Sequence, residues 1–135
     1  MIETIAHYYE NYNANIHRGV HALSQEATDL YEASRQTLQR HFNIKEASEV
    51  IFTSGTTHAI NIVANGFSTI LSSGDEIIVS ALEHHSNIVP WQMLCEKTGA
   101  ILKVLPMNDH GELIIDAFDD ILSDKTQLVF VNHVS

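Results

Sequence analysis

The sequence predicts an α/β fold, with a mainly parallel sheet and helices on both of its faces. Short apolar runs typical of strands alternate with helical patterns along the chain. One of these runs, residues 76–80 (EIIVS), is almost continuously apolar, as in a strand covered on both faces. Turns rich in glycine and serine separate the two kinds of segment. This alternation favours parallel strands joined by helical crossovers.

The first part of the chain is expected to be helical. Apolar residues recur between Ile2 and Tyr9 with helical spacing. Ser24 is the expected N-cap of a longer helix that runs to about Phe42, because apolar or small residues follow it with the period of an amphipathic helix.

Strands and helices are expected to alternate in the rest of the chain. A helical pattern from Ile60 to Ile70 follows the first strand, a helix over residues 88–98 ends at the C-cap Gly99, and a shorter helix covers residues 116–122. The expected strands are residues 49–53 (EVIFT), 76–80 (EIIVS), 101–105 (ILKVL) and 127–131 (QLVFV). Because the chain stops at Ser135, directly after a strand-like run, we expect it to be a piece of a longer protein.

Composition narrows the classes of function. The chain has 135 residues, 44% of them hydrophobic, and 17 acidic against 7 basic residues, a formal charge of −10. This charge disfavours binding to nucleic acid or to anionic membranes. No run approaches the ~18 apolar residues of a membrane span, and the first residues do not resemble a secretory signal. A single cysteine excludes an internal disulfide, so a reducing cytoplasm is the simplest setting.

Three polar segments follow expected strands: residues 54–57 (SGTT), 83–85 (EHH) and 132–135 (NHVS). In parallel sheets, ligands bind beyond the carboxyl ends of the strands. We therefore expect these segments to share one rim of the sheet, where a ligand binds.

The segment SGTTHAIN allows two interpretations. Free backbone N–H groups and the positive end of a helix dipole attract a phosphate, or Ser54 or Thr56 simply caps the helix. The chain has neither the GxxxxGK[ST] motif of ATP-binding loops nor the GxGxxG motif of dinucleotide-binding proteins. If the segment binds a phosphate, we therefore expect that phosphate to belong to another kind of cofactor.

The adjacent histidines His84 and His85 also allow several interpretations. A zinc site needs further donors, and neither HExxH nor a Cys/His cluster is present, so we expect no metal site. His17 and His21 are four residues apart, but Gly19 between them favours a loop. One of the two histidines could instead hold its neutral imidazole face-on above an aromatic ring. His84 is a better candidate for this role than His85, because it is nearer to the end of the strand.

Together, NANIHRGVHALS, FTSGTTHAINIVANGF, GDEIIVSALEHHSNIVPWQ and TQLVFVNHVS resemble the pyridoxal 5'-phosphate (PLP) dependent cysteine desulfurases, nearest to the SufS-like branch with its selenocysteine lyases, in the class V aminotransferase superfamily. The resemblance covers essentially the whole chain. It implies part of the PLP fold type I large domain, with N-terminal helices and an active-site loop in residues 1–45 and alternating strands and helices in residues 46–135.

The resemblance also implies roles for individual residues. Thr56 and Thr57 match the turn that holds the PLP phosphate. His84 matches the catalytic histidine that stacks on the pyridine ring and assists proton transfer. A loop near the active site, at the substrate or dimer rim, is matched by His17, Arg18 and His21. Ser54 departs from the family, which has arginine before Gly-Thr-Thr.

The family's Schiff-base lysine, the aspartate paired with the pyridine nitrogen and the sulfur-accepting cysteine all lie downstream of the HVS segment. The 135 residues alone are therefore expected to be inactive and not to bind PLP stably. The resemblance implies that the full-length parent is a homodimer that removes sulfur from L-cysteine, giving alanine and an enzyme persulfide. The sulfur then passes to an acceptor protein for Fe–S cluster or sulfur-cofactor assembly.

Two alternatives remain open. The parent could be a selenocysteine lyase or another class V aminotransferase-type enzyme, and the residues that discriminate these reactions lie beyond Ser135. A non-enzymatic phosphate-binding or assembly module would require the natural protein to end at Ser135. Its sheet would then finish on an uncovered strand, which invites intermolecular pairing.

Overall fold

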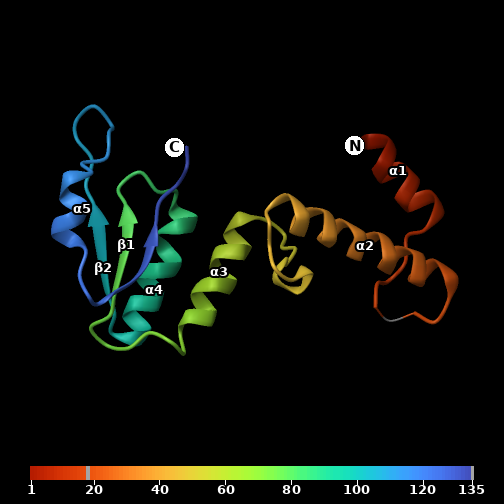
Figure 1. Ribbon diagram of the computed structural model, residues 1–135, viewed down its shortest axis with the longest axis horizontal. Helices are drawn as coiled ribbons and strands as arrows, with labels where there is room; N and C mark the ends of the chain where they lie inside the picture. Colours follow the sequence, from red (N-terminus) through yellow and green to blue (C-terminus); the bar gives the residue numbers. More distant parts are fainter. Residues whose placement is uncertain (18, 135) are drawn as a thin grey trace. The chain divides into compact units, whose positions relative to one another are not determined.

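The computed structural model describes residues 1–17 and 19–134. The chain divides into two compact units, Met1–Phe52 and Thr53–Ser135 (Figure 1). The first unit is helical, and the second contains a parallel sheet with its covering helices.

The first unit contains α1 (Ile2–Asn11) and α2 (Ala22–His41), close to the two expected helices. The expected N-cap Ser24 is wrong, because His21 caps α2 and its ring accepts a hydrogen bond from the Ser24 backbone N–H at 3.3 Å. The Ser24 hydroxyl is buried and donates instead to the carbonyl oxygen of Asn15 at 2.6 Å. Ser24 therefore fixes the preceding loop rather than the start of the helix.

The strand expected over residues 49–53 is also wrong. The short 3-10 helix η1 (Ala47–Glu49) occupies its start, and no described residue pairs with residues 50–53 as a strand. Arg35 on α2 explains part of this difference, because it donates to the carbonyl oxygens of Val50 at 3.1 Å and Ala47 at 2.9 Å. A side chain thus uses backbone acceptors that a neighbouring strand would otherwise take.

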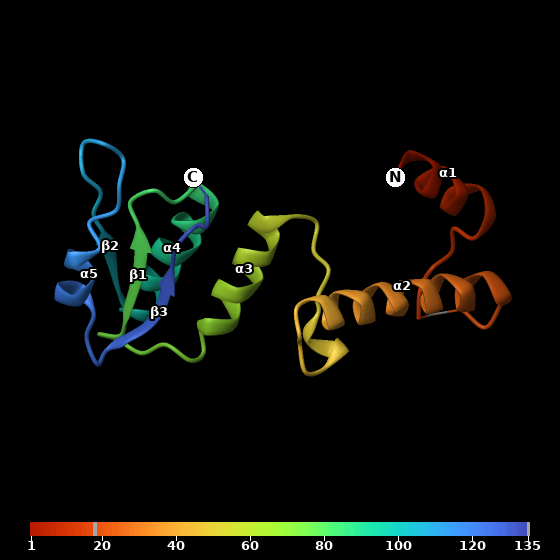
Figure 2. The same ribbon diagram turned by 45° about the horizontal axis from the view of Figure 1, so that its top comes forward.

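The second unit is built on three parallel strands in the order β2-β1-β3 (Figure 2). Strands β1 (Glu76–Ser80), β2 (Ile101–Leu105) and β3 (Thr126–Phe130) confirm the other three expected strands, with β3 starting one residue early. The helical elements of this unit are α3 (Thr56–Phe67), η2 (His85–Asn87), α4 (Val89–Thr98) and α5 (Asp116–Ile121).

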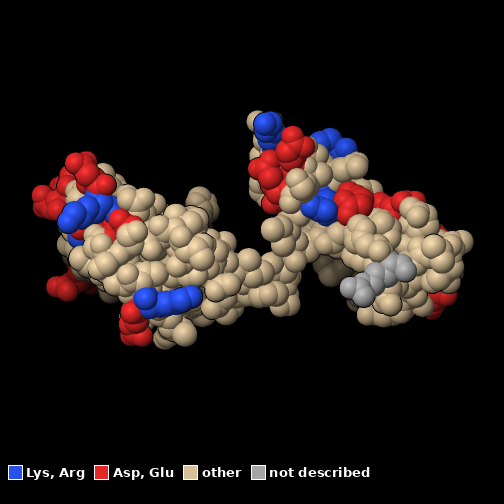
Figure 3. All heavy atoms as spheres, turned by 90° about the horizontal axis from the view of Figure 1, so that it is seen from below, with Lys and Arg blue, Asp and Glu red and all other residues tan. Residues whose placement is uncertain are grey.

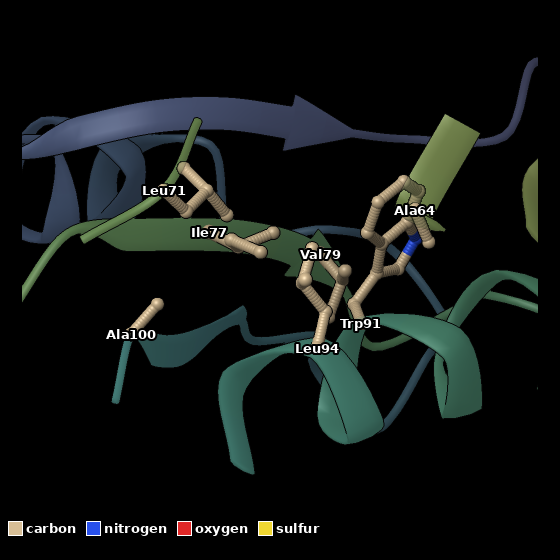
Figure 4. Close-up of a cluster of buried hydrophobic side chains, with 7 residues drawn as sticks. All are labelled: Ala64, Leu71, Ile77, Val79, Trp91, Leu94 and Ala100. Carbon is tan, nitrogen blue, oxygen red and sulfur yellow. The ribbon is translucent and has the colours of Figure 1, made fainter. Parts of the chain in front are cut away.

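Every residue of the central strand β1 is buried, as its apolar run predicts. On one face, Ile77 and Val79 pack into a core with Trp91 and Leu94 of α4 (Figure 4). Trp91 is fully buried, and its ring stacks on that of Phe130 with centroids 3.9 Å apart. Burial of these large apolar surfaces is what joins α4 to the sheet.

The other face of β1 carries Ile78 and the charged Glu76. Lys103 of β2 forms an ion pair with Glu76 at 2.7 Å and donates to the carbonyl oxygen of Ile121, the last residue of α5, at 2.9 Å. Helices therefore cover both faces of the sheet, as predicted.

Gly99 ends α4 in the left-handed conformation, with φ 78°, which confirms the predicted C-cap. A Cβ atom at this position would lie 2.8 Å from the Ser73 Oγ, in the turn that leads into β1. Glycine is therefore required both by the backbone angle and by the close approach of this turn.

Acidic side chains dominate the charged surface, in line with the 17 acidic and 7 basic residues of the sequence. On the face drawn in Figure 3, basic side chains stand beside acidic ones rather than gathering in one patch. No helix in the described part of the chain is both long and apolar enough to span a membrane.

Candidate functional site

A pocket of about 640 Å³ lies beyond the carboxyl ends of β1 and β3, within the second unit. Residues from the start of α3, from the loop after β1 and from the segment after β3 line it together. These residues are Thr56, Ile60, Leu82, Glu83, His84, His85, Ser86, Asn87, Asn132 and Val134. The three polar segments thus meet at one site, as predicted, although the first of them does not follow a strand.

The start of α3, at which Thr56 lines this pocket, has unused hydrogen-bond donors. The first helical bond runs from the Ala59 N–H to the carbonyl oxygen of Gly55 at 3.0 Å. No described acceptor takes the N–H groups of Thr56, Thr57 or His58. Free amides at the positive end of a 12-residue helix attract anions.

Side-chain capping by Ser54 or Thr56 does not occur, because Gly55 is the N-cap and no side chain caps the helix. Gly55 adopts φ 142° and ψ 171°, angles that side-chain-bearing residues rarely adopt. The Ser54 hydroxyl instead lies 3.0 Å from His58 Nδ1. The amides of the first turn therefore remain available to a ligand.

Thr56 and Thr57 occupy different places at this helix start. Thr56 lines the pocket with its side chain exposed. Thr57 is also exposed but does not line the pocket, and its carbonyl oxygen accepts from the Asn61 side chain at 2.8 Å. The structure thus brings Thr56 and His84 into one pocket and places Thr57 next to it along the helix.

His84 lies on the loop between β1 and η2, with its side chain exposed at the pocket. Its Nδ1 atom accepts a hydrogen bond from the Ser86 backbone N–H at 3.2 Å and lies 2.9 Å from Ser86 Oγ. Because an amide N–H can only donate, a neutral His84 ring carries its proton on Nε2. The ring meets His85 edge-on, at 78° between the planes.

Glu83 is a polar residue of the site whose role the sequence did not indicate. Its Oε1 accepts hydrogen bonds from the Ser80 hydroxyl at 2.7 Å and the Asn132 backbone N–H at 2.6 Å. Its Oε2 accepts from the Asn87 side-chain amide at 2.7 Å. One feature of the sequence could have indicated this role. Glu83 is an acidic residue directly before the histidine pair, in a loop expected to lie near residues 132–135.

His17 and His21 lie in the first unit, whereas the second unit forms the pocket. His17 adopts a left-handed backbone, φ 57°, and its Nε2 lies 3.2 Å from Glu32 Oε1. His21 caps α2. Arg18, expected in the same loop, lies outside the described residues.

Metal binding and thiol chemistry have little support in the described part of the chain. No group of three or more His, Cys, Asp or Glu side chains there is arranged to hold a metal ion. Cys95 is half-buried against the core of the second unit, and burial raises the pKa of its thiol. A raised pKa disfavours the reactive thiolate, so Cys95 has the character of a packing residue.

The pocket combines a helix start that has free amides with an exposed imidazole that, in its neutral form, carries its proton on Nε2. This donor set fits a ligand that carries both a phosphate and a flat aromatic ring, and PLP is such a molecule. The pocket volume, about 640 Å³, lies within the range of small-molecule sites.

Comparison with known proteins reveals related chains. The model of the aminotransferase class-V family matches residues 1–135. A probable cysteine desulfurase of Staphylococcus epidermidis is 48% identical over 136 residues, which cover 100% of this chain and 33% of the relative.

Solved structures that are similar to this chain are also cysteine desulfurases. The apo structure of a cysteine desulfurase from Thermococcus onnurineus is 39% identical with a TM-score of 0.89, covering 99% of this chain and 33% of that one. The Escherichia coli cysteine desulfurase CsdA is 34% identical with a TM-score of 0.76, covering 95% and 32%. The chain thus spans about a third of the length of these relatives.

Proposed function

The chain belongs to the aminotransferase class-V family, and from this premise we propose that its full-length parent is a PLP-dependent cysteine desulfurase. The proposed reaction removes sulfur from L-cysteine and leaves alanine and an enzyme persulfide. Residues 1–135 supply one part of the PLP site, and the remaining two thirds of the parent supply the rest. The similar proteins named above support this proposal, because each is described as a cysteine desulfurase or a probable one.

The observation that carries the proposal is the pairing of free amides at the start of α3 with His84 in one pocket. The backbone N–H groups of Thr56 and Thr57 are proposed to bind the PLP phosphate, together with the Thr56 hydroxyl. Their partial positive charge would favour the negatively charged phosphate.

His84 is proposed to lie against the pyridine ring and to hold a proton at Nε2 near the substrate. The contact with Ser86 keeps Nδ1 unprotonated in the neutral ring, so Nε2 is the atom that carries and transfers this proton. PLP, when bound, supplies an electron sink for the bonds that break in the substrate. The lysine that binds PLP covalently and the sulfur-accepting cysteine are proposed to belong to the rest of the parent.

The proposal also includes partners and a compartment. A sulfur-acceptor protein would receive the sulfur for Fe–S cluster or sulfur-cofactor assembly, and the parent would act as a homodimer in the cytoplasm. His17, Arg18 and His21 are proposed to lie at the substrate entrance or the dimer rim. Together these features describe a sulfur-mobilising enzyme.

The test uses the full-length parent, purified with PLP and supplied with L-cysteine and a thiol reductant. We expect alanine and sulfide in equal amounts. Replacing His84 with alanine is expected to lower kcat/KM about 100-fold, because ring contact and proton transfer are both lost. The exposed His110, outside the pocket, provides the control: His110→Ala is expected to retain wild-type kinetics.

Failure of the PLP-loaded parent to form alanine would contradict the proposed function. Supplying selenocysteine in the same assay compares the two substrates directly. A kcat/KM far higher for selenocysteine than for L-cysteine would identify a selenocysteine lyase instead.

A further inference from the structure

The Glu83 carboxylate connects three segments that meet at the pocket. It accepts hydrogen bonds from Ser80 at the end of β1, from the Asn132 N–H after β3 and from Asn87 in η2, at 2.6 to 2.7 Å. Bonds this short to a carboxylate are typical of charge-assisted hydrogen bonds. Glu83 therefore joins the end of β1 and the segment after β3 to Asn87, the last residue of η2.

The hydrogen bonds around Asn87 can be arranged in only one way. The Trp91 indole N–H, which can only donate, is 2.9 Å from Asn87 Oδ1. Asn87 Nδ2 is therefore left to donate to the Glu83 carboxylate, which can only accept. The chain of bonds runs from the buried core residue Trp91 through Asn87 to Glu83.

His84 lies inside this framework. It follows Glu83 in the chain, and its carbonyl oxygen accepts the Asn87 backbone N–H at 2.8 Å. Glu83, directly before His84, is thus anchored through its carboxylate, and the same carboxylate binds Asn87, which closes the turn after His84. Trp91, at the far end of the chain of bonds, is fully buried and stacked on Phe130.

We propose that Glu83 is a positioning residue that fixes the loop carrying His84 at the mouth of the pocket. The inference rests on the proposed function, in which His84 meets the PLP ring. Glu83 acts through the backbone of its neighbour and through Asn87, and it has no proton-transfer step of its own.

Because these hydrogen bonds can be arranged in only one way, the proposal can be tested by exchanging the carboxylate of Glu83 and the amide of Asn87. In Glu83→Gln, the new amide faces Asn87 Nδ2, so two donors oppose each other. Rotating the Asn87 amide would only move the mismatch to the Trp91 N–H. In Asn87→Asp, two carboxylates oppose each other. When both substitutions are combined, the new glutamine donates to the new aspartate, which still accepts from Trp91.

The experiment compares the full-length parent with Glu83→Gln, Asn87→Asp and the double variant. In the PLP-free protein, we expect amide hydrogen exchange over residues 81–88 to accelerate about tenfold in each single variant and to recover in the double variant. In the PLP-loaded protein, we expect kcat to fall about tenfold in each single variant and to recover in the double, with KM little changed. The visible circular dichroism of bound PLP should follow the same pattern.

Glu112→Gln is the matched control, because Glu112 also accepts from an asparagine amide, that of Asn108 at 3.0 Å, but on an exposed loop. It should leave all three measurements unchanged. A double variant no better than the single variants would overturn the proposal. So would exchange rates that respond while kcat and the PLP signal do not, since Glu83 would then have a structural role only. If the wild-type parent formed no alanine, the proposed function would fail, and the exchange measurements in PLP-free protein would still decide whether Glu83 fixes the loop.

Discussion

Glu76 shows how the central strand accommodates a buried carboxylate. Its side chain is only 10% exposed, and it accepts hydrogen bonds from Lys103 at 2.7 Å, Ser123 at 2.6 Å and Thr126 at 3.2 Å. The hydrogen bond from Lys103, followed by that from Ser123, holds the pKa of the Glu76 carboxyl below its ordinary value, despite the opposing effect of burial. The charged form is therefore the one that the fold favours.

This pKa predicts a dependence of stability on acid. The carboxyl has its ordinary pKa of 4.5 in the unfolded chain and a lower one in the fold, so its stabilising contribution is present above that value and is lost as pH falls through the folded pKa. Glu76→Gln should therefore lower the free energy of unfolding by a constant amount near neutral pH. The difference from wild type should shrink in acid.

Urea unfolding of the chain from neutral pH to about pH 3 measures this difference. Lys103→Met removes the ion-pair partner of Glu76 together with the hydrogen bond to Ile121, so it should lower the free energy of unfolding at neutral pH by at least as much. A wild-type advantage over Glu76→Gln that stayed constant or grew in acid would contradict the account.

The sequence predicted some site residues better than others, for a physical reason. Thr56 and His84 belong to short motifs whose chemistry is local, a helix start and an exposed ring, and both line the pocket. The contacts of Glu83 with Asn132 join residues 49 positions apart, so no local pattern contains them. Ser24 was misassigned as a cap for a similar reason, since its hydroxyl bonds to Asn15 in the preceding loop.

At the scale of the elements, the start of α3 supplies the free amides beside the pocket. Its first amides are free because the backbone turns at Gly55, where φ is 142°. A Cβ atom at Gly55 or at Gly66, within the same helix, would have no atom within 4 Å. The two glycines therefore differ in backbone conformation and not in the space around them.

Replacing each glycine with alanine should consequently change stability in opposite directions. Gly55→Ala is expected to lower the free energy of unfolding by about 1–3 kcal/mol, because alanine is strained at these backbone angles. Gly66→Ala is expected to raise it by about 0.5–1 kcal/mol, because alanine is the better helix former. Chemical denaturation of both variants measures the two changes. Equal changes in the free energy of unfolding for the two variants, or stabilisation by Gly55→Ala, would show that the turn at Gly55 does not have the backbone conformation described above.

The elements themselves were predicted with uneven success. The strand over residues 76–80 was predictable because burial on both faces requires a continuous apolar run. The run over residues 49–53 is similarly rich in β-branched and apolar residues, but a strand also needs a partner. Arg35 instead binds the backbone carbonyl of Val50 within this segment and that of Ala47 just before it. Composition reports the propensity of a segment and not its hydrogen-bond partner.

At the scale of the whole molecule, the alternation of strands and helices predicted both the α/β class and the edge of the sheet where the pocket forms. The parallel strands place the ends of β1 and β3 at the same edge, so residues from position 56 to position 134 meet there. The chain spans about a third of the length of its relatives, and in our proposal its pocket supplies only part of the cofactor site.

In our proposal, the start of α3 holds the phosphate of PLP in that pocket, and His84 meets the ring. The most direct test is a crystal structure of the full-length parent with PLP bound. We expect the phosphate oxygens to lie about 3 Å from the backbone nitrogens of Thr56 and Thr57, with the His84 imidazole stacked on the pyridine ring. A phosphate bound away from the start of α3, or a pyridine ring out of contact with His84, would contradict it.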